Sequence, residues 1–237
     1  CPSRSVEGYP FRLEVRCAAP SFSGRLGALE GSGSVGDVLA VAHLYSPSLI
    51  MAEVHGPLVF RTADRALDLK LAWNELRASH RIRNGGLDRD SLEIVAPVLS
   101  LAGRDVPPVT FRADEFEAHL RPNPDRAAAV AAFDLALRLT RLDAPGLDAL
   151  TGLTGPMDAL ISTTLLQTGA LRGASPAQSL ESWRLAGGDL EIREVKLAKG
   201  EARVEASGKL GLDEAHRLAG RIELQLTGVG PLLQRMG

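Results

Sequence analysis

The chain has 237 residues, of which 45% are hydrophobic and 24% charged, and this composition is typical of a folded protein and excludes wholesale disorder. The 27 basic residues do not outnumber the 29 acidic ones, and aromatic residues make up only 4%. Nucleic-acid binding, which needs a basic excess and stacking side chains, is therefore not expected. No apolar run approaches the roughly 20 residues of a membrane-spanning helix.

The first predicted element is a β-hairpin that folds back around Gly8-Tyr9-Pro10. This turn brings Cys1 opposite Cys17 and Arg4 opposite Glu14. A disulfide closing the loop would contribute about 3 kcal/mol to stability and would indicate an oxidising compartment. Two alternatives are a pair of free thiols in a reducing compartment and a lipidated Cys1 that leaves Cys17 unpaired.

Further along the chain, apolar residues alternate with polar ones, which predicts a meander of strands. The predicted strands cover residues 11–17, 37–44, 48–54, 58–60, 67–73, 91–95, 109–120 and 130–142. Between Pro145 and Pro176 the chain breaks into short pieces separated by glycine and proline. Residues 156–167 fit either a strand or a one-sided helix.

The last part of the chain holds the clearest helix signal and then returns to strands. Ser175-Pro176 combines an N-cap residue with proline at the first helical position, and it predicts a helix over 176–185 that ends at Gly187-Gly188. In the strands that follow, the alternation changes parity near Arg193-Glu194, which predicts a β-bulge. A helical turn is expected at 230–233.

Together these elements predict a mainly β fold, with one long curved antiparallel sheet and a few short helices. We expect a single elongated domain over residues 1–237, with a sub-boundary near 143–176. A sheet with one apolar face must hide that face in a closed core or use it to hold an apolar ligand. Periodicity alone favours neither a closed barrel or sandwich nor an open groove or half-barrel.

A family resemblance favours the open groove. The segment from Gly8-Tyr9-Pro10-Phe11-Arg12 to Cys17 resembles the signature of a bacterial envelope family, domain of unknown function 2125. The strands from Gly188 to Leu224 look like the tail that this family shares with AsmA-like proteins. The resemblance implies a periplasmic protein, anchored to the inner membrane by an N-terminal segment that is not in this chain. It also implies a curved β-groove of the kind associated with lipid transport.

Other motifs give no support for catalysis, so the protein is not expected to be an enzyme. Gly31-Ser32-Gly33-Ser34-Val35-Gly36 matches the dinucleotide-binding pattern, but the next residues read as a strand, so we expect a flexible loop. The five histidines lack metal-ligand spacing, and no metal or cofactor is predicted. The cluster of Arg77, Arg81 and Arg83 fits a solvated loop, or a contact for anionic lipid headgroups.

The predicted function is therefore non-catalytic binding or transport of lipid in an apolar groove. The alternative is a structural or assembly subunit that packs on a membrane protein complex in the same compartment. The residues predicted to line the groove are Phe11, Leu13, Val15, Leu69, Leu71, Leu135, Leu137, Ile222 and Leu224. The residues predicted on the opposite, solvated side are Arg12, Glu14, Asp68, Lys70, Asp134, Arg138 and Glu223.

Overall fold

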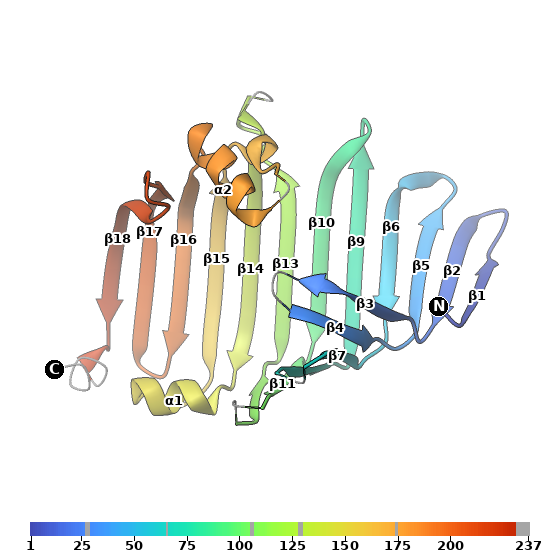
Figure 1. The fold of residues 1–237 in the computed structure, drawn as a ribbon, viewed down its shortest axis with the longest axis horizontal. Coiled ribbons are helices and arrows are strands. Elements are labelled where there is room, and N and C mark those ends of the chain that lie inside the picture. Colours follow the sequence, from blue (N-terminus) through green and yellow to red (C-terminus); the bar gives the residue numbers. More distant parts are fainter. Residues whose placement is uncertain (27–28, 65, 105–106, 128–129, 174, 231–237) are drawn as a thin grey trace. The chain divides into compact units, whose positions relative to one another are not determined.

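Strands dominate the computed structural model, which describes residues 1–237 except 27–28, 65, 105–106, 128–129, 174 and 231–237 (Figure 1). The first twelve strands are β1 Ser3–Glu7, β2 Arg12–Ala18, β3 Ser21–Leu26, β4 Leu29–Ser34, β5 Val38–His43, β6 Ser46–Val54, β7 Leu58–Thr62, β8 Asp68–Ala72, β9 Glu75–Arg83, β10 Gly86–Val95, β11 Val98–Ala102 and β12 Val109–Arg112. The others are β13 Glu115–Pro122, β14 Phe133–Leu142, β15 Met157–Leu165, β16 Leu190–Lys199, β17 Ala202–Leu212 and β18 Leu218–Thr227. The helices are α1 Pro145–Thr151 and α2 Pro176–Leu185, with a 3₁₀ turn, η2, at Thr168–Ala170.

The strands form two antiparallel sheets. One has twelve strands in the order β1-β2-β5-β6-β9-β10-β13-β14-β15-β16-β17-β18, and the other has six in the order β12-β11-β8-β7-β4-β3. The described strands do not close into a barrel. The mainly β antiparallel fold with few short helices is thus confirmed, but the single meander is wrong, because the chain alternates between two sheets.

Proline marks each place where the chain passes from the larger sheet to the smaller one. The three junctions contain Ala19-Pro20, Gly56-Pro57 and Ala96-Pro97, and proline lacks the N–H that would continue a ladder of hydrogen bonds. Two of the junctions close in the same way: Val35 N donates to Pro20 O and Ala113 N donates to Pro97 O, both at 3.1 Å. The larger-sheet hairpins begin at residues 3, 38, 75 and 115, so this pattern repeats about every 35 to 40 residues.

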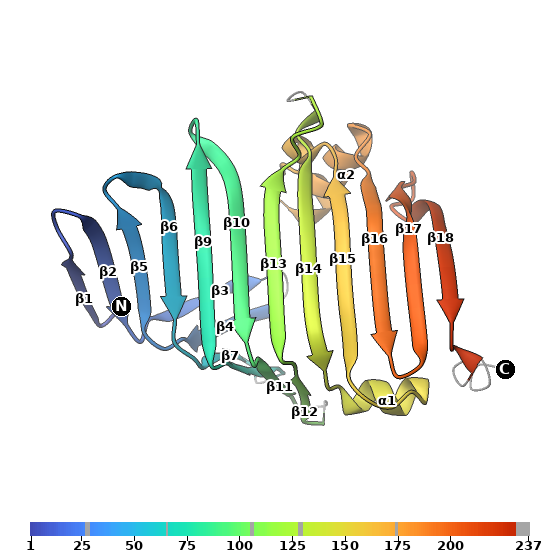
Figure 2. The ribbon, with the colours of Figure 1, turned by 180° about the vertical axis from the view of Figure 1, so that it is seen from behind.

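The chain divides into two compact units. The first unit comprises Cys1–Glu117 and Leu139–Thr151, and the second comprises Ala118–Arg138 and Gly152–Gly237. In the first unit, β3 and β4 lie on one side of the strands of the larger sheet, as both views show (Figures 1 and 2). Trp73, between β8 and β9, donates its indole N–H to Val54 O at 2.7 Å.

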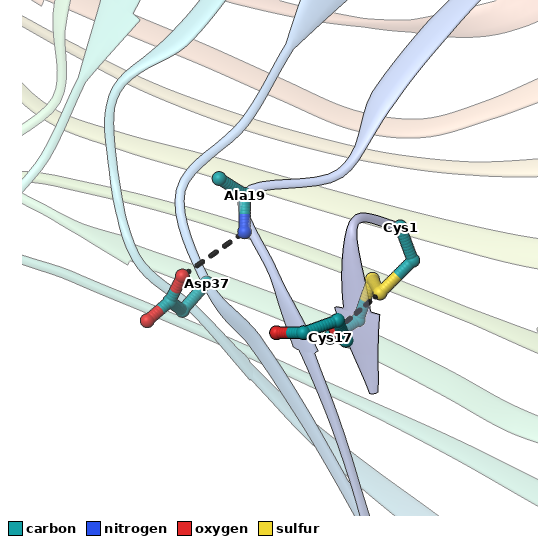
Figure 3. Close-up of a disulfide and its surroundings, with 5 residues drawn as sticks. Cys1, Cys17, Ala19 and Asp37 are labelled. Carbon is teal, nitrogen blue, oxygen red and sulfur yellow. Dashed lines mark hydrogen bonds between the residues drawn. A yellow bond between two sulfur atoms is a disulfide. The ribbon is translucent and has the colours of Figure 1, made fainter. Parts of the chain in front are cut away.

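The opening hairpin and its disulfide are confirmed. Cys1 and Cys17 are joined, and Ala19 N donates to the carboxylate of Asp37 at 3.0 Å beside the bridge (Figure 3). The predicted register is wrong, since Arg4 lies opposite Cys17 rather than Glu14. Glu14 instead forms ion pairs with Arg12 at 2.5 Å and Arg16 at 3.1 Å along its own strand.

We expect loss of the disulfide to lower the free energy of unfolding by about 3 kcal/mol, because the bridge closes a loop of this length in the unfolded chain. Urea unfolding of the double variant Cys1→Ser/Cys17→Ser measures this change. The reduced wild type is the matched control, because it lacks the bridge but keeps both cysteines. Thiol labelling of the denatured, unreduced protein should find no free cysteine. Two labelled thiols per chain would rule out the bridge.

The second unit confirms the predicted helix and bulge. Helix α2 spans Pro176–Leu185, and the hydroxyl of Ser175 caps it by accepting a hydrogen bond from Gln178 N. The β16–β17 register shifts between Ile192 and Val195, at the predicted bulge. Residues 156–167 contain strand β15, whereas most of the helical turn expected at 230–233 lies outside the described residues.

The glycine-rich segment is not the loop predicted from the sequence. Residues 29–34 form strand β4, paired with β3 and β7. A Cβ on Gly31 would overlap the ring of Phe60, and one on Gly33 would overlap the ring of Phe22. The two rings stack with their centroids 6.4 Å apart. These glycines therefore admit aromatic side chains from neighbouring strands.

Candidate functional site

One face of the larger sheet in the first unit is apolar, and we call it the N-terminal apolar face. Residues directly opposite each other on paired strands share a face, and the register carries one face from Val15 through Ala40 and Ala52 to Ala78. Its apolar members are Val6, Leu13, Val15, Val38, Ala40, Ala42, Ile50, Ala52, Val54, Leu76, Ala78, Ile82, Leu92 and Ile94.

The N-terminal apolar face is covered at one end and open at the other. Ile94, beside the junction that leads into β11, is only 6% exposed. Nearer the hairpin tips, Leu13 is 44% exposed, Ile50 38% and Val15 37%. These side chains lie on the face and in contact with solvent, which is unfavourable unless another molecule covers them.

The smaller sheet has an apolar face of its own, and it contains two of the predicted groove residues. Leu69 and Leu71 lie in β8, opposite Leu101 and Leu99 of β11. They are therefore not on the same sheet as Leu13 and Val15, and the prediction of one common sheet is wrong for them. Both leucines are half-buried. Alternation correctly predicted that these leucines lie in a strand, but it does not identify the sheet to which a strand belongs.

A second apolar surface, the C-terminal apolar face, covers strands β15 to β18 of the second unit. Its register places Ile222 opposite Gly208 and Leu224 opposite Ala206. The face is formed by Ala159, Ile161, Leu165, Leu190, Ile192, Val195, Leu197, Val204, Ala206, Leu210, Leu212, Leu218, Ile222, Leu224 and Leu226.

The outermost strand, β18, is the most open part of the C-terminal apolar face. Leu218 is 76% exposed, Leu224 62%, Leu226 50% and Ile222 42%. The opposite face of these strands is charged, with residues such as Lys196 and Glu205 directly across from each other. In the second unit, the larger sheet thus has one apolar and one charged side. The opposite side of the first unit's strands is mixed, since Glu14 and Arg16 lie there beside Val41 and Leu39.

The remaining predicted groove residues have different environments. Phe11 lies in the turn before β2 and is 76% exposed. Leu135 and Leu137 lie in β14 and are half-buried.

Two residues predicted on the solvated side are in fact buried. Glu14 is 7% exposed beneath the guanidinium groups of Arg12 and Arg16. Asp134 is 5% exposed and accepts hydrogen bonds from Thr164 at 2.8 Å and Asn123 at 2.7 Å. Charged residues are buried when partners satisfy them. The partners of Glu14 lie on its own strand, whereas those of Asp134 come from other segments that the pattern of its strand does not reveal.

The carboxylate of Asp134 remains ionised because of these partners. Burial raises the pKa of Asp134, but the hydrogen bonds from Thr164, Asn123 and Arg121, together with the charge of Arg193, outweigh burial and lower the pKa below its usual value. Arg121 and Arg193 lie 3.3 and 3.4 Å from the carboxylate. This cluster stabilises the second unit and holds the carboxylate of Asp134 in its charged form.

The arginine cluster identified from the sequence lies on a strand rather than a loop. Arg77, Arg81 and Arg83 belong to β9, where Arg77 pairs with Glu75 and Arg83 lies 3.3 Å from Asp88. Sequence reasoning missed Arg89, which lies on β10 directly opposite Arg81.

A cavity of about 420 Å³ lies on β16, β17 and β18. Charged and polar side chains predominate in its lining, which includes Arg193, Glu194, Lys196, Glu205 and Glu223. Of the predicted groove residues it contains only Leu224. Its polar lining does not suit an acyl chain, so the apolar faces remain the candidate site.

No group of three or more histidine, cysteine, aspartate or glutamate side chains among the described residues could hold a metal ion. In the same part of the chain, no helix has both the length and the apolar character needed to cross a membrane.

These features define a class of proteins that are mainly β and disulfide-bonded and whose sheets have apolar faces exposed to solvent. The chain belongs to the family described as "Uncharacterized protein conserved in bacteria (DUF2125)", whose model matches residues 1–237. A disulfide in a bacterial protein indicates an oxidising compartment outside the cytoplasm. No curated protein and no solved structure matches the chain.

Proposed function

We propose that this protein is a non-catalytic periplasmic envelope protein that binds lipid acyl chains on its apolar sheet faces. One observation carries the proposal: the chain has extensive apolar faces and very little buried core. Among the described residues, the buried apolar ones are Ile94, Ala132, Ala144, Leu166, Trp183 and Ala202. Only three of these are larger than alanine, whereas a chain of this length can bury a much larger core.

An acyl chain fits these faces better than a small polar ligand does. The exposed side chains are aliphatic, and they offer no array of hydrogen-bond donors that would orient a polar substrate. A fully buried methylene group gains about 0.8 kcal/mol. On an open face each methylene gains only part of this, so an acyl chain is held by the sum of many contacts rather than by a deep cavity.

The disulfide and the resemblance to AsmA-like proteins support a periplasmic location. Under this proposal, a membrane anchor from outside this chain keeps the apolar faces near the inner membrane, from which lipid is taken up or to which it is delivered. No nucleic acid and no cofactor takes part.

Photocrosslinking from neighbouring positions tests which face the lipid occupies. Val15 and Arg16 are adjacent on β2 but point to opposite faces. A photoreactive amino acid at Val15 should form adducts with phospholipid in cells, while the matched variant at Arg16 should not. Equal labelling at both positions, or none at either, contradicts binding on the N-terminal apolar face.

A second function, as an assembly subunit of a membrane complex, is favoured by β18. This strand is the last in its sheet, and a sheet edge can pair with a strand of another protein. A partner that also packs on the C-terminal apolar face would cover the exposed leucines of β18. Purification of the protein without lipid, but together with a defined membrane complex, would favour this function over lipid binding.

A further inference from the structure

Three hairpin tips of the first unit lie at the same end of the larger sheet (Figures 1 and 2). They are the turns between β1 and β2, between β5 and β6, and between β9 and β10. The register confirms their proximity, since Arg12 at the first tip is opposite His43 at the second, and Leu49 is opposite Arg81 near the third. Leu44 N also donates to Phe11 O at 3.1 Å, which joins the first two tips.

Aromatic side chains project from two of these tips. Tyr9 is 87% exposed, Phe11 76% and Tyr45 79%, and these include both tyrosines of the chain. His43 stacks on Tyr45 with ring centroids 5.0 Å apart. Tyrosine is enriched where one end of a side chain is in an apolar phase and the other is in water, as at a membrane surface.

Near the third tip, two arginines of like charge are directly opposite each other. Arg81 on β9 and Arg89 on β10 are register partners, and both are exposed. Within the described part of the chain neither has an acidic partner, because Asp88 pairs with Arg83 and Asp90 with His80. Like charges across a strand pair are unfavourable by themselves, and a bound anion would remove that cost.

We propose that this end of the first unit, which we call the tip surface, docks on a bilayer that contains anionic phospholipid. The aromatic side chains lie at headgroup depth, and the Arg81–Arg89 pair binds lipid phosphate, which guanidinium groups recognise through paired hydrogen bonds. Because the three hairpin tips lie at the same end of the sheet, they can contact one membrane surface together. This docking is independent of whether the apolar faces carry lipid.

Vesicle flotation of the full chain tests the proposal, using phosphatidylcholine vesicles with and without about one third phosphatidylglycerol. We expect the wild type to float with the anionic vesicles and only weakly with the neutral ones. The double variant Arg81→Gln/Arg89→Gln should lower binding to anionic vesicles about tenfold while binding to neutral vesicles is unchanged. The triple variant Tyr9→Ser/Phe11→Ser/Tyr45→Ser should lower binding to both by about tenfold or more.

Matched controls lie elsewhere in the first unit. Arg104→Gln/Arg112→Gln removes the same charge from the smaller sheet and the loop before it, and Leu150→Ser removes an apolar side chain that is 77% exposed on α1. Both controls should float like the wild type, and circular dichroism should show that all variants are folded.

The proposal is overturned if the wild type floats with neither kind of vesicle, which is the result expected if the tip surface binds a protein instead. It is also overturned if the tip variants float like the controls. Lipid that co-purifies with the protein is measured separately, so lipid binding on the apolar faces can fail while docking holds.

Discussion

Replacing Asp134 with leucine is expected to lower the free energy of unfolding by about 3 kcal/mol. The substitution removes the acceptor for Thr164 and Asn123 and leaves the guanidinium groups of Arg121 and Arg193 without their shared counter-ion. Urea unfolding measures the change. Asp134→Asn should cost less, because an amide oxygen still accepts a hydrogen bond from Thr164.

The matched control is Asp114→Leu, which breaks an exposed ion pair with Arg141 at 2.9 Å. Exposed ion pairs contribute at most about 1 kcal/mol, so this variant should remain close to the wild type. Equal effects of the two leucine variants would show that the Asp134 cluster has no special role in stability.

The same cluster should make stability depend on pH in the acid range. The pKa of Asp134 is lower in the folded protein than its ordinary value of 3.8, so the ionised carboxylate stabilises the fold at higher pH. This contribution is present above about pH 4 and is lost as pH falls through the folded-state pKa. Asp134→Asn should show less loss of stability over that range than the wild type does.

The second large effect concerns lipid. The double variant Leu13→Asp/Ile50→Asp places two carboxylates on the N-terminal apolar face, where both side chains are about two fifths exposed. Because the new carboxylates stay hydrated, the protein should fold with little loss of stability. An acyl chain would have to dehydrate them, so we expect most of the bound lipid to be lost.

Leu150→Asp is the control for this variant, because it makes the same chemical change on α1, outside both apolar faces. It should keep the lipid content of the wild type. If the double variant unfolds, the face is a sealed core rather than a binding surface. If it folds and keeps its lipid, this face does not hold the acyl chains.

The strands and α2 were predicted well from the sequence because each is specified by residues that are close together in the chain. The N-cap Ser175 and the following Pro176 predicted where α2 begins. The change in the parity of alternation near Arg193 predicted the bulge. The cysteine spacing revealed the bridge, although the register within that hairpin came out differently. The alternation in each strand also identified its apolar residues.

The division into two sheets was missed because period-two alternation is the same in both. Leu69 and Leu135 have equivalent patterns, yet they belong to different sheets. A usable signal was present in the prolines at residues 20, 57 and 97, which recur with the repeat of the hairpins. Arg81 belonged to the arginine cluster that the sequence offered for anionic lipid headgroups, but the rest of the tip surface was missed because its residues meet only through strand pairing. Tyr9 and Tyr45 are far apart in sequence, and Arg81 and Arg89 face each other only once their register is known.

The lipid content of the wild-type protein tests most directly whether the apolar faces carry lipid. The protein would be purified from a bacterial periplasm without detergent, its mass measured under native conditions, and its lipid extracted and quantified. We predict phospholipid in a fixed ratio to the protein, present in the native complex and absent after extraction. A protein that is folded, disulfide-bonded and free of lipid would contradict the account.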